Sequence, residues 1–267
     1  MSTPDVVIAA ARRSVFGKYR GGISAIRPDD LLGMTLVELR KALPDLDPAG
    51  IDDVIMGDAN GAGEDNRNVA RMASLLAGFP VSVPGVTLNR LCGSGAEAIV
   101  QAARAVRSGD MDLVIAGGVE SMSRAPYVLP KSDTPLDPRT RLEQTTVGWR
   151  MVNPEFPAHW TASLGECAQR SAEQRGIDRV AQDEWALRSH TLASAAWESG
   201  LHDDFAFPVA GVSRDESIRP STTMEALADL KPAFTPNGSV TAGNSSPLND
   251  GAVATVITRS DMARDLG

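Results

Sequence analysis

The thiol of Cys92 is the side chain in this sequence whose setting most favours nucleophilic chemistry. It stands in the segment Asn-Arg-Leu-Cys-Gly-Ser-Gly, residues 89–95, between an apolar run at 83–88 and a helix-like run at 96–107. A helix N-terminus favours negative charge and presents unpaired N–H groups, and the thiolate form of cysteine is the nucleophile. The neighbouring glycines have no side chain to block a substrate. The segment therefore predicts a reactive thiol at a helix entrance.

Other interpretations of this segment stay open from the residues alone. A free cysteine is most often a small buried hydrophobic residue, and a Gly-Ser-Gly turn can cradle a phosphate or simply allow close packing. The second cysteine, Cys167, is far from Cys92 in the sequence, and neither stands in a CxxC motif or beside a histidine at ligand spacing. The acidic residues look scattered. We therefore expect neither a metal site nor a pair of catalytic carboxylates.

Composition narrows the class of protein. The chain has 267 residues, of which 42% are hydrophobic, and a net charge of −8. This length fits one large or two modest domains, and the negative charge argues against nucleic acid or an anionic membrane as partner. The apolar run at 6–11 lacks a basic flank before it, and no run approaches the roughly 18 apolar residues of a membrane span. Unpaired cysteines favour a reducing compartment, so we expect a cytoplasmic protein.

The elements that must position Cys92 follow from the apolar periodicity. Strand-like runs lie near 5–10, 53–58, 84–89, 112–117 and 252–258, and they alternate with helix-like runs at 30–43, 68–77 and 96–107. This alternation predicts an α/β fold with a mostly parallel central sheet and helices on both faces. The run at 96–107 has almost no polar face. It should therefore be covered on all sides, inside something thicker than a three-layer sandwich.

The pattern changes between 120 and 247, where proline, charged residues and short helices replace the alternation. One longer helix is predicted at 180–199, with Asp178 as its N-cap and Gly200 after its end. Trp185, Leu192 and Ala196 fall on one stripe of this helix. We interpret 120–247 as an inserted domain of helices and loops that binds ligand or acts as a lid. Residues 1–119 and 248–267 then form one α/β domain.

Five segments, taken in order, resemble the thiolases, which exchange acyl groups between carbon and coenzyme A. The resemblance covers essentially the whole chain, and two further segments, 63–72 and 146–154, resemble the subgroup that acts on 3-oxoadipyl-CoA. The five segments are Asn-Arg-Leu-Cys-Gly-Ser-Gly at 89–95, Ala-Gly-Gly-Val-Glu-Ser-Met-Ser-Arg-Ala-Pro at 116–126, Ala-Leu-Arg-Ser-His at 186–190, Leu-Lys-Pro-Ala-Phe at 230–234 and Val-Thr-Ala-Gly-Asn-Ser-Ser-Pro-Leu-Asn-Asp-Gly at 240–251.

The resemblance implies that Cys92 is the acylated nucleophile. Its thiolate attacks the 3-keto carbon of a 3-ketoacyl-CoA, acetyl-CoA leaves, and free CoA then takes the acyl group from the sulfur. The backbone N–H of Cys92 helps to stabilise the oxyanion. CoA and acyl-CoA enter as substrates, and no permanently bound cofactor is expected. The family positions near CoA correspond here to Ser246 at the pantetheine arm, Ala242 in the same motif, Arg219 at the adenine end, and Leu164, where relatives often carry methionine.

The family pattern continues beyond this sequence, into a second, similarly folded half that supplies Asn-Glu-Ala-Phe, Gly-His-Pro and Cys-Gly-Gly-Gly motifs. His159, His190 and His202 match none of these motifs; we interpret His190 as solvated and Cys167 as a buried helix residue. We expect the C-terminal domain to be missing or supplied by a separate chain, and the 267-residue chain alone to be inactive. A homodimer or homotetramer should cover the apolar surface.

Two alternatives to a thiolase remain from the sequence. One is a noncatalytic half-thiolase that binds acyl-CoA or serves in assembly. The other is a condensing enzyme like the ketoacyl synthases, which share the nucleophile and the architecture. The motif at 240–251 favours a thiolase over the second alternative. Transfer of an acetyl group to Cys92 distinguishes an enzyme from the first.

Overall fold

The computed structural model describes residues 5–132, 134–135 and 141–266. The chain folds as two compact units. The first unit comprises residues 1–125, 203–216 and 249–267, and the second comprises 126–202 and 217–248. Residues 203–216, which the sequence prediction left in the insertion, belong to the first unit. The ion pair between Arg13 and Asp215, at 2.8 Å, helps to hold this segment there.

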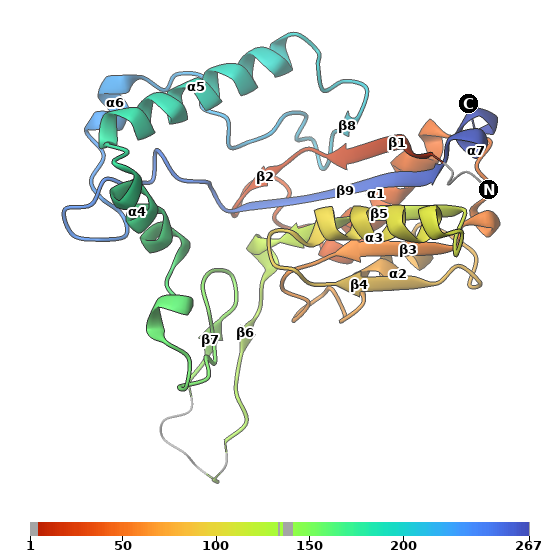
Figure 1. Ribbon diagram of the computed structural model, residues 1–267, viewed down its shortest axis with the longest axis horizontal. Coiled ribbons are helices and arrows are strands. Elements are labelled where there is room, and N and C mark those ends of the chain that lie inside the picture. The colour runs from red at the N-terminus through yellow and green to blue at the C-terminus, as the bar shows by residue number, and fades with distance from the viewer. Residues whose placement is uncertain (1–4, 133, 136–140, 267) are drawn as a thin grey trace. The chain divides into compact units, whose positions relative to one another are not determined.

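A seven-stranded sheet forms the centre of the first unit (Figure 1). Most of its strands run in one direction, as predicted, but β9 is antiparallel to β1, β2 and β5. The insertion leaves the sheet after Ser121 and the chain returns at Asp250, which is paired directly opposite Ser121. The chain returns to the sheet at the edge where β5 ended, so β9 runs antiparallel to β5. The strand order is β4 (Gly85–Leu88), β3 (Asp53–Gly57), β5 (Leu113–Ser121), β9 (Asn249–Arg259), β1 (Val6–Ser14) and β8 (Ala206–Phe207), with β2 (Gly17–Lys18) paired to β9.

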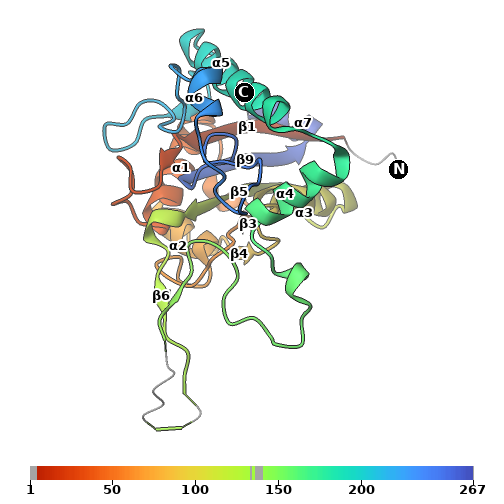
Figure 2. The same cartoon turned by 90° about the vertical axis from the view of Figure 1, so that its left-hand side faces the viewer.

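Helices cover both faces of this sheet, as predicted (Figures 1 and 2). On one face, α3 (Ser94–Ser108) packs on Ile55, Val114 and Ile257. On the other, α1 (Pro28–Ala42) contacts α2 (Val69–Leu76) and the central strands. Side chains alternate across a strand, so each buried strand supplies apolar residues to both layers. The first unit also contains α7 (Ser260–Asp265) and the short 3-10 helices η1 (Pro48–Gly50) and η2 (Met122–Arg124).

One face of α3 is buried, and the opposite face is not. Ala98, Ala102 and Val106 are fully buried against the sheet, where their small size allows close packing. Val100 lies off this stripe and is 41% exposed. The prediction that the helix is covered on all sides is therefore wrong for the described chain, because the sheet reaches only the residues spaced four apart on one side.

The start of α3 lies very close to the end of β3. A Cβ atom on Gly57 would lie 2.3 Å from the carbonyl carbon of Ser94 and 2.4 Å from the nitrogen of Gly95. These are backbone atoms at a helix start, so they cannot rotate away as a flexible side chain could. Only glycine fits at position 57. Because glycine has no side chain, the first residues of α3 can lie directly against the end of β3.

The second unit consists of helices, short strands and loops. It contains α4 (Leu164–Arg175), α5 (Arg179–Glu198), α6 (Met224–Ala228), η3 (Ala158–Trp160) and the pair β6 (Tyr127–Val128) and β7 (Glu143–Gln144). The predicted helix at 180–199 is confirmed as α5. The Asp178 carboxylate accepts the N–H of Ala181 at its start, and Gly200 follows its end with φ +75°.

The stripe predicted on α5 is not a buried one. Trp185 is 68% exposed and Leu192 is 51% exposed. Asp183 and Ser194 are instead the buried positions of this helix. Among the helices of the described residues, none combines the length and apolarity needed to cross a bilayer.

We expect Gly57→Ala to lower the free energy of unfolding by about 1–3 kcal/mol, because the added methyl group overpacks against backbone atoms. Urea unfolding monitored by circular dichroism measures the change. Gly50→Ala is the matched control, since a Cβ atom at Gly50 meets nothing within 4 Å. Equal midpoints for the two variants would contradict the close approach at Gly57.

Candidate active site

Cys92 lies at the start of α3. It directly precedes Gly93, the N-cap of the helix, and its thiol is free and exposed. The predicted position at a helix N-terminus is confirmed. The interpretation as a buried hydrophobic residue is excluded by its exposure. Its role as the nucleophile stays a prediction.

The turn that presents Cys92 has a strained backbone. Leu91 has φ +52°, in the left-handed region that a residue with a Cβ atom rarely adopts. Ser94 closes the turn: its hydroxyl donates to the carbonyl of Leu91 at 2.6 Å and accepts the N–H of Arg90 at 2.8 Å. The N–H of Ser94 donates to the same Leu91 carbonyl at 2.9 Å. Both backbone ends of the turn are thus held, and the Cys92 side chain is left accessible.

Carboxyl groups gather where β3 and β5 end. Asp58, Asp65 and Asp250 are buried, and Glu120 lies among them. Burial, together with the charges of these three, raises the pKa of Glu120 to about 7. Burial and the charge of Asp65 raise the pKa of Asp58 to about 6. One carboxylate oxygen of Asp58 and one of Asp250 meet no hydrogen-bond donor among the described residues.

The view of the acidic residues as scattered is therefore wrong. Asp58 directly follows β3, and Glu120 is near the end of β5, which is the parallel neighbour of β3. Adjacent parallel strands end at the same edge, and this signal could have been found in the sequence. Across residues 5–132, 134–135 and 141–266, no group of three or more His, Cys, Asp or Glu side chains has an arrangement that could hold a metal ion.

The residues predicted to contact CoA lie in the second unit, whereas Cys92 lies in the first. All four are exposed: Leu164 at the first position of α4, Arg219, Ala242 and Ser246. The structure thus brings these four into one compact unit. Their role as CoA contacts stays a prediction.

The loop that carries Ala242 and Ser246 is fixed by its neighbours. Thr241 is fully buried, and its hydroxyl accepts the N–H of Gly243 at 3.2 Å. The side chain of Asn244 accepts the N–H of Thr241 at 2.7 Å and donates to Asp183 of α5 at 2.9 Å. These bonds hold the loop backbone in this conformation. The exposed residues Ala242 and Ser246 are presented by it rather than buried in it.

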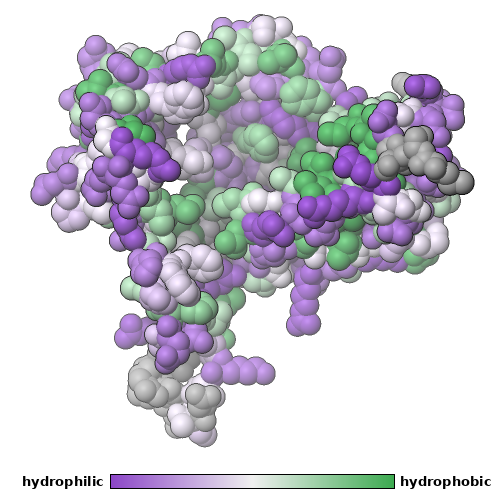
Figure 3. Space-filling view, in the orientation of Figure 1, coloured by the Kyte–Doolittle hydropathy of each residue, from purple (hydrophilic) through white to green (hydrophobic). Residues whose placement is uncertain are grey.

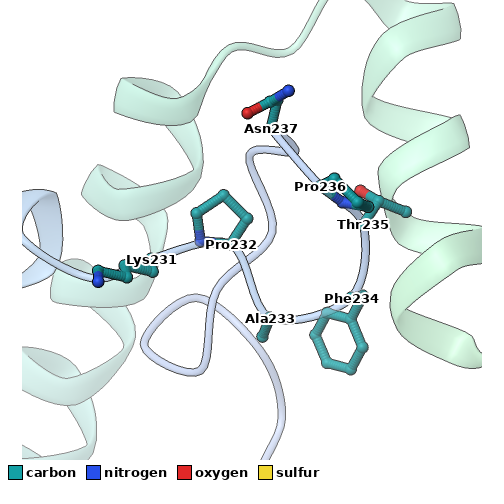
Figure 4. Close-up of a pocket in the computed structure, with 7 residues that line it drawn as sticks. All are labelled: Lys231, Pro232, Ala233, Phe234, Thr235, Pro236 and Asn237. Carbon is teal, nitrogen blue, oxygen red and sulfur yellow. The ribbon is translucent and has the colours of Figure 1, made fainter.

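An open pocket lies beside this loop (Figure 4). It has a volume of about 470 Å³ and is lined by residues 231–237. Its backbone is joined to the Thr241 loop, since the N–H of Ala233 donates to the carbonyl of Val240 at 3.0 Å. The ring of Phe234 fills the space beside Gly165 of α4, where a Cβ atom would lie 2.0 Å from the ring. The Leu-Lys-Pro-Ala-Phe motif at 230–234 is the sequence signal for this segment, and it does not reveal that Phe234 packs on α4.

His190, which the sequence predicted to be solvated, is half-buried and makes a hydrogen bond that the sequence did not predict. Its Nδ1 atom accepts the backbone N–H of Arg219 at 3.3 Å. Burial, and then the charge of Arg219, lower the pKa of His190 below its ordinary value. The neutral imidazole is the form that can accept this hydrogen bond. His190 therefore holds the backbone of Arg219. The sequence could not predict this bond, because the two residues are 29 positions apart in the chain.

Cys167 is exposed, so the prediction of a buried residue is wrong. It does lie on a helix, but α4 buries Gly165, Gln169 and Ala172. These three are spaced at four and three residues and form one stripe. Cys167 falls outside that stripe.

The family model described as the N-terminal domain of thiolase matches residues 6–261. The chain belongs to the thiolase family. It is a thiolase-type acyltransferase with the α/β fold that the motifs implied. Both the resemblance and the fold class predicted from the sequence are confirmed.

Two curated thiolases illustrate the similarity. The 3-oxoadipyl-CoA/3-oxo-5,6-dehydrosuberyl-CoA thiolase of Escherichia coli is 48% identical over 273 residues, covering 98% of this chain and 68% of that protein. The beta-ketoadipyl-CoA thiolase of Pseudomonas knackmussii is 46% identical over 272 residues, with the same two shares covered. This thiolase chain thus spans about two thirds of the length of these relatives.

Solved thiolase structures share the same fold. The acetyl-CoA acetyltransferase of Bacillus anthracis superposes with a TM-score of 0.90 at 38% identity, covering 100% of this chain and 68% of that one. Human mitochondrial 3-ketoacyl-CoA thiolase in complex with CoA gives 0.89 at 32% identity, covering 98% and 67%.

We expect Glu120→Gln to stabilise this thiolase chain at pH 8 and to have little effect at pH 5. The folded-state pKa of Glu120, about 7, exceeds its ordinary value of 4.5. The folded state therefore binds a proton more tightly, and the stability due to this group falls as the pH rises from about 4.5 to about 7. A neutral amide avoids that loss. The thermal midpoint at pH 8 should rise by at least about 2 °C.

Asp52→Asn is the control, because Asp52 is an exposed carboxylate just before β3, at the opposite end of the sheet. It should give no gain at pH 8. If Glu120→Gln shifts the thermal midpoint by the same amount at pH 5 and pH 8, the folded protein does not disfavour ionisation of Glu120.

Proposed function

We propose that the Cys92 thiolate is the nucleophile of a thiolase reaction on 3-ketoacyl-CoA. The observation that carries the proposal is an exposed, free thiol directly before the N-cap of α3, on a turn with a left-handed residue. The sulfur adds to the 3-keto carbon and forms a tetrahedral alkoxide. N–H groups at a helix start are available to stabilise this negative charge.

The second part of the cycle regenerates the thiol. Cleavage of the bond between carbons 2 and 3 leaves the shortened acyl group on the Cys92 sulfur and releases the acetyl-CoA enolate, which takes up a proton. The thiol of a second CoA then attacks the thioester and carries the acyl group away. The covalent intermediate divides one difficult cleavage into two easier steps.

We further propose 3-oxoadipyl-CoA as the substrate. The support is the identity of 46% and 48% to proteins named beta-ketoadipyl-CoA and 3-oxoadipyl-CoA thiolase. The segments 63–72 and 146–154 also resemble that subgroup. The same reaction run backwards forms the carbon–carbon bond, and the direction depends on substrate supply.

We propose that CoA binds the second unit as a substrate, with no cofactor held permanently. Ser246 and Ala242 would contact the pantetheine arm, and Arg219 the adenine end. Leu164 would line the path of the substrate's acyl chain. Their exposure and the hydrogen-bonded Thr241 loop support this. The second unit, residues 126–202 and 217–248, would then be the CoA-binding part of the chain, and the first unit would carry the nucleophile.

We propose that the base that deprotonates the Cys92 thiol is not a histidine of this chain. The chain has three histidines, His159, His190 and His202, and all three belong to the second unit. None matches a thiolase motif for the base. We therefore propose that this chain alone acylates slowly and does not turn over, since general acid–base help is worth about 10²–10⁴-fold.

We expect acetyl-CoA to acetylate Cys92 of the chain, and Cys92→Ser to abolish the modification because the nucleophile is gone. Mass spectrometry of the tryptic peptide that contains residue 92 measures it. Cys167→Ser is the matched control, since Cys167 is also a free, exposed thiol, and it should be acetylated at Cys92 as before. Binding of acetyl-CoA without acetylation of Cys92 would instead support the noncatalytic module, which membership of the thiolase family does not favour.

We also propose that the chain forms a homodimer or homotetramer. We propose that it is a cytoplasmic protein. Apolar side chains are exposed over β1 and α3 of the first unit, including Ile8 at 58% and Val100 at 41% (Figure 3). Monomeric proteins rarely leave such surface open to water.

Light scattering should therefore return a multiple of the chain mass, and Ile8→Glu should shift the distribution toward monomer. A chain that scatters only as a monomer would contradict the assembly.

A further inference from the structure

We propose that Glu120 is a positioning residue for the turn that presents Cys92, acting through Ala59 and Asn89. The proposal rests on the proposed function of Cys92 as the nucleophile. Among the described residues, no direct hydrogen bond joins Glu120 to the sulfur or to its turn. Its influence is carried by hydrogen bonds across the ends of three neighbouring strands.

The strand register brings these residues together. Gly57, the last residue of β3, pairs with Leu88 of β4 on one side and with Gly118 of β5 on the other. The chain after β3 and the chain after β4 therefore leave the sheet side by side, next to Glu120. The N–H of Asp58 already donates to the carbonyl of Leu88 at 3.1 Å.

Three hydrogen bonds connect Glu120 to the turn. The N–H of Ala59 donates to Oε2 of Glu120 at 3.0 Å. The carbonyl of Ala59 accepts Nδ2 of Asn89 at 2.8 Å. Oδ1 of Asn89 in turn accepts the N–H of Leu91 at 2.8 Å. Both peptide groups of Ala59 are thus engaged, one by the carboxylate and one by the amide that holds the turn.

The last bond matters because Leu91 is strained. A non-glycine residue in the left-handed region persists only where its surroundings over-determine it. Ser94 fixes the carbonyl of Leu91, and Asn89 fixes its N–H. Asn89 is an exposed side chain, so water competes for its amide unless Ala59 is held in place. Releasing Ala59 should let Leu91 relax and move the adjacent sulfur away from the start of α3.

The local electrostatics also favour a functional role for Glu120. It is opposed by Asp58 and Asp65 from the chain after β3 and by Asp250 from β9, and burial raises its pKa to about 7. A carboxyl group in such surroundings costs stability when it ionises. Groups retained against that cost are typical of functional sites.

The test compares Glu120→Ala, Glu120→Gln and Asn89→Ala in the full chain. Glu120→Ala and Glu120→Gln remove the same charge, but only the amide oxygen of glutamine can still accept the Ala59 N–H. We measure the rates at which Cys92 reacts with acetyl-CoA and with iodoacetamide, using alkylation of Cys167 in the same molecule as the internal reference. Both Ala variants should slow Cys92 by about tenfold, while Glu120→Gln should stay within about twofold of the unmodified chain.

Two further variants separate positioning from stability. Asp52→Ala removes a carboxylate that accepts the N–H groups of Asp112 and Leu113, at 2.7 and 2.9 Å, at the other end of β5. It should lower the thermal midpoint and leave the Cys92 rates unchanged. The double variant Asn89→Ala/Glu120→Ala should be no slower than either single one, because both substitutions break the same connection. Asn89 is exposed, so its variant tests the connection even if Glu120→Ala fails to fold.

The outcomes separate this proposal from the one on which it rests. Unchanged Cys92 rates in both Ala variants, a loss in Glu120→Gln equal to that in Glu120→Ala, or an equal loss in Asp52→Ala would overturn the positioning role. Those results would leave Cys92 as the nucleophile if acetylation is intact. If acetyl-CoA never modifies Cys92 but iodoacetamide shows the expected pattern, the positioning role stands and the nucleophile proposal fails.

Discussion

The contact between the start of α3 and the ends of two parallel strands is the constraint on which the nucleophile turn depends. Gly57 of β3 has no side chain where Ser94 and Gly95 approach, and a Cβ atom on Gly118 of β5 would lie 2.7 Å from the carbonyl oxygen of Gly57. The helix entrance is therefore fixed on backbone atoms. A turn anchored in this way can keep Leu91 in a left-handed conformation that it would not hold alone.

The same edge of the sheet carries two opposite electrostatic tendencies. The start of α3 favours negative charge, which suits a thiolate and an oxyanion. The buried carboxyl groups Asp58, Asp65 and Asp250 disfavour further negative charge, as the raised pKa of Glu120 shows. Backbone and amide groups lie between them, since Ala59 and Asn89 connect Glu120 to the turn. The turn that carries Cys92 is thus connected to Glu120 by hydrogen bonds.

The insertion is accommodated by the direction of one strand. β5 and β9 are far apart in the sequence yet pair from Leu113–Thr258 to Ser121–Asp250. Because the start of β9 lies opposite the residue where β5 ends, the insertion does not interrupt the pairing register of these two strands. Within that unit, the buried polar residues Asp183 and Gln169 fix the loops that present the proposed CoA contacts. Function on these loops therefore depends on a framework built from buried hydrogen bonds.

The sequence by itself determined the thiolase family, the alternation of strands and helices, and the place of Cys92 at a helix entrance. Each of these depends on local order: an apolar period, a cap or a motif. Only the tertiary structure decided that β9 runs antiparallel, that His190 accepts the N–H of Arg219, and that Cys167 and one face of α3 are exposed. These depend on which strands pair and which helix stripe meets a neighbour, because burial and hydrogen bonding join residues that are distant in the chain.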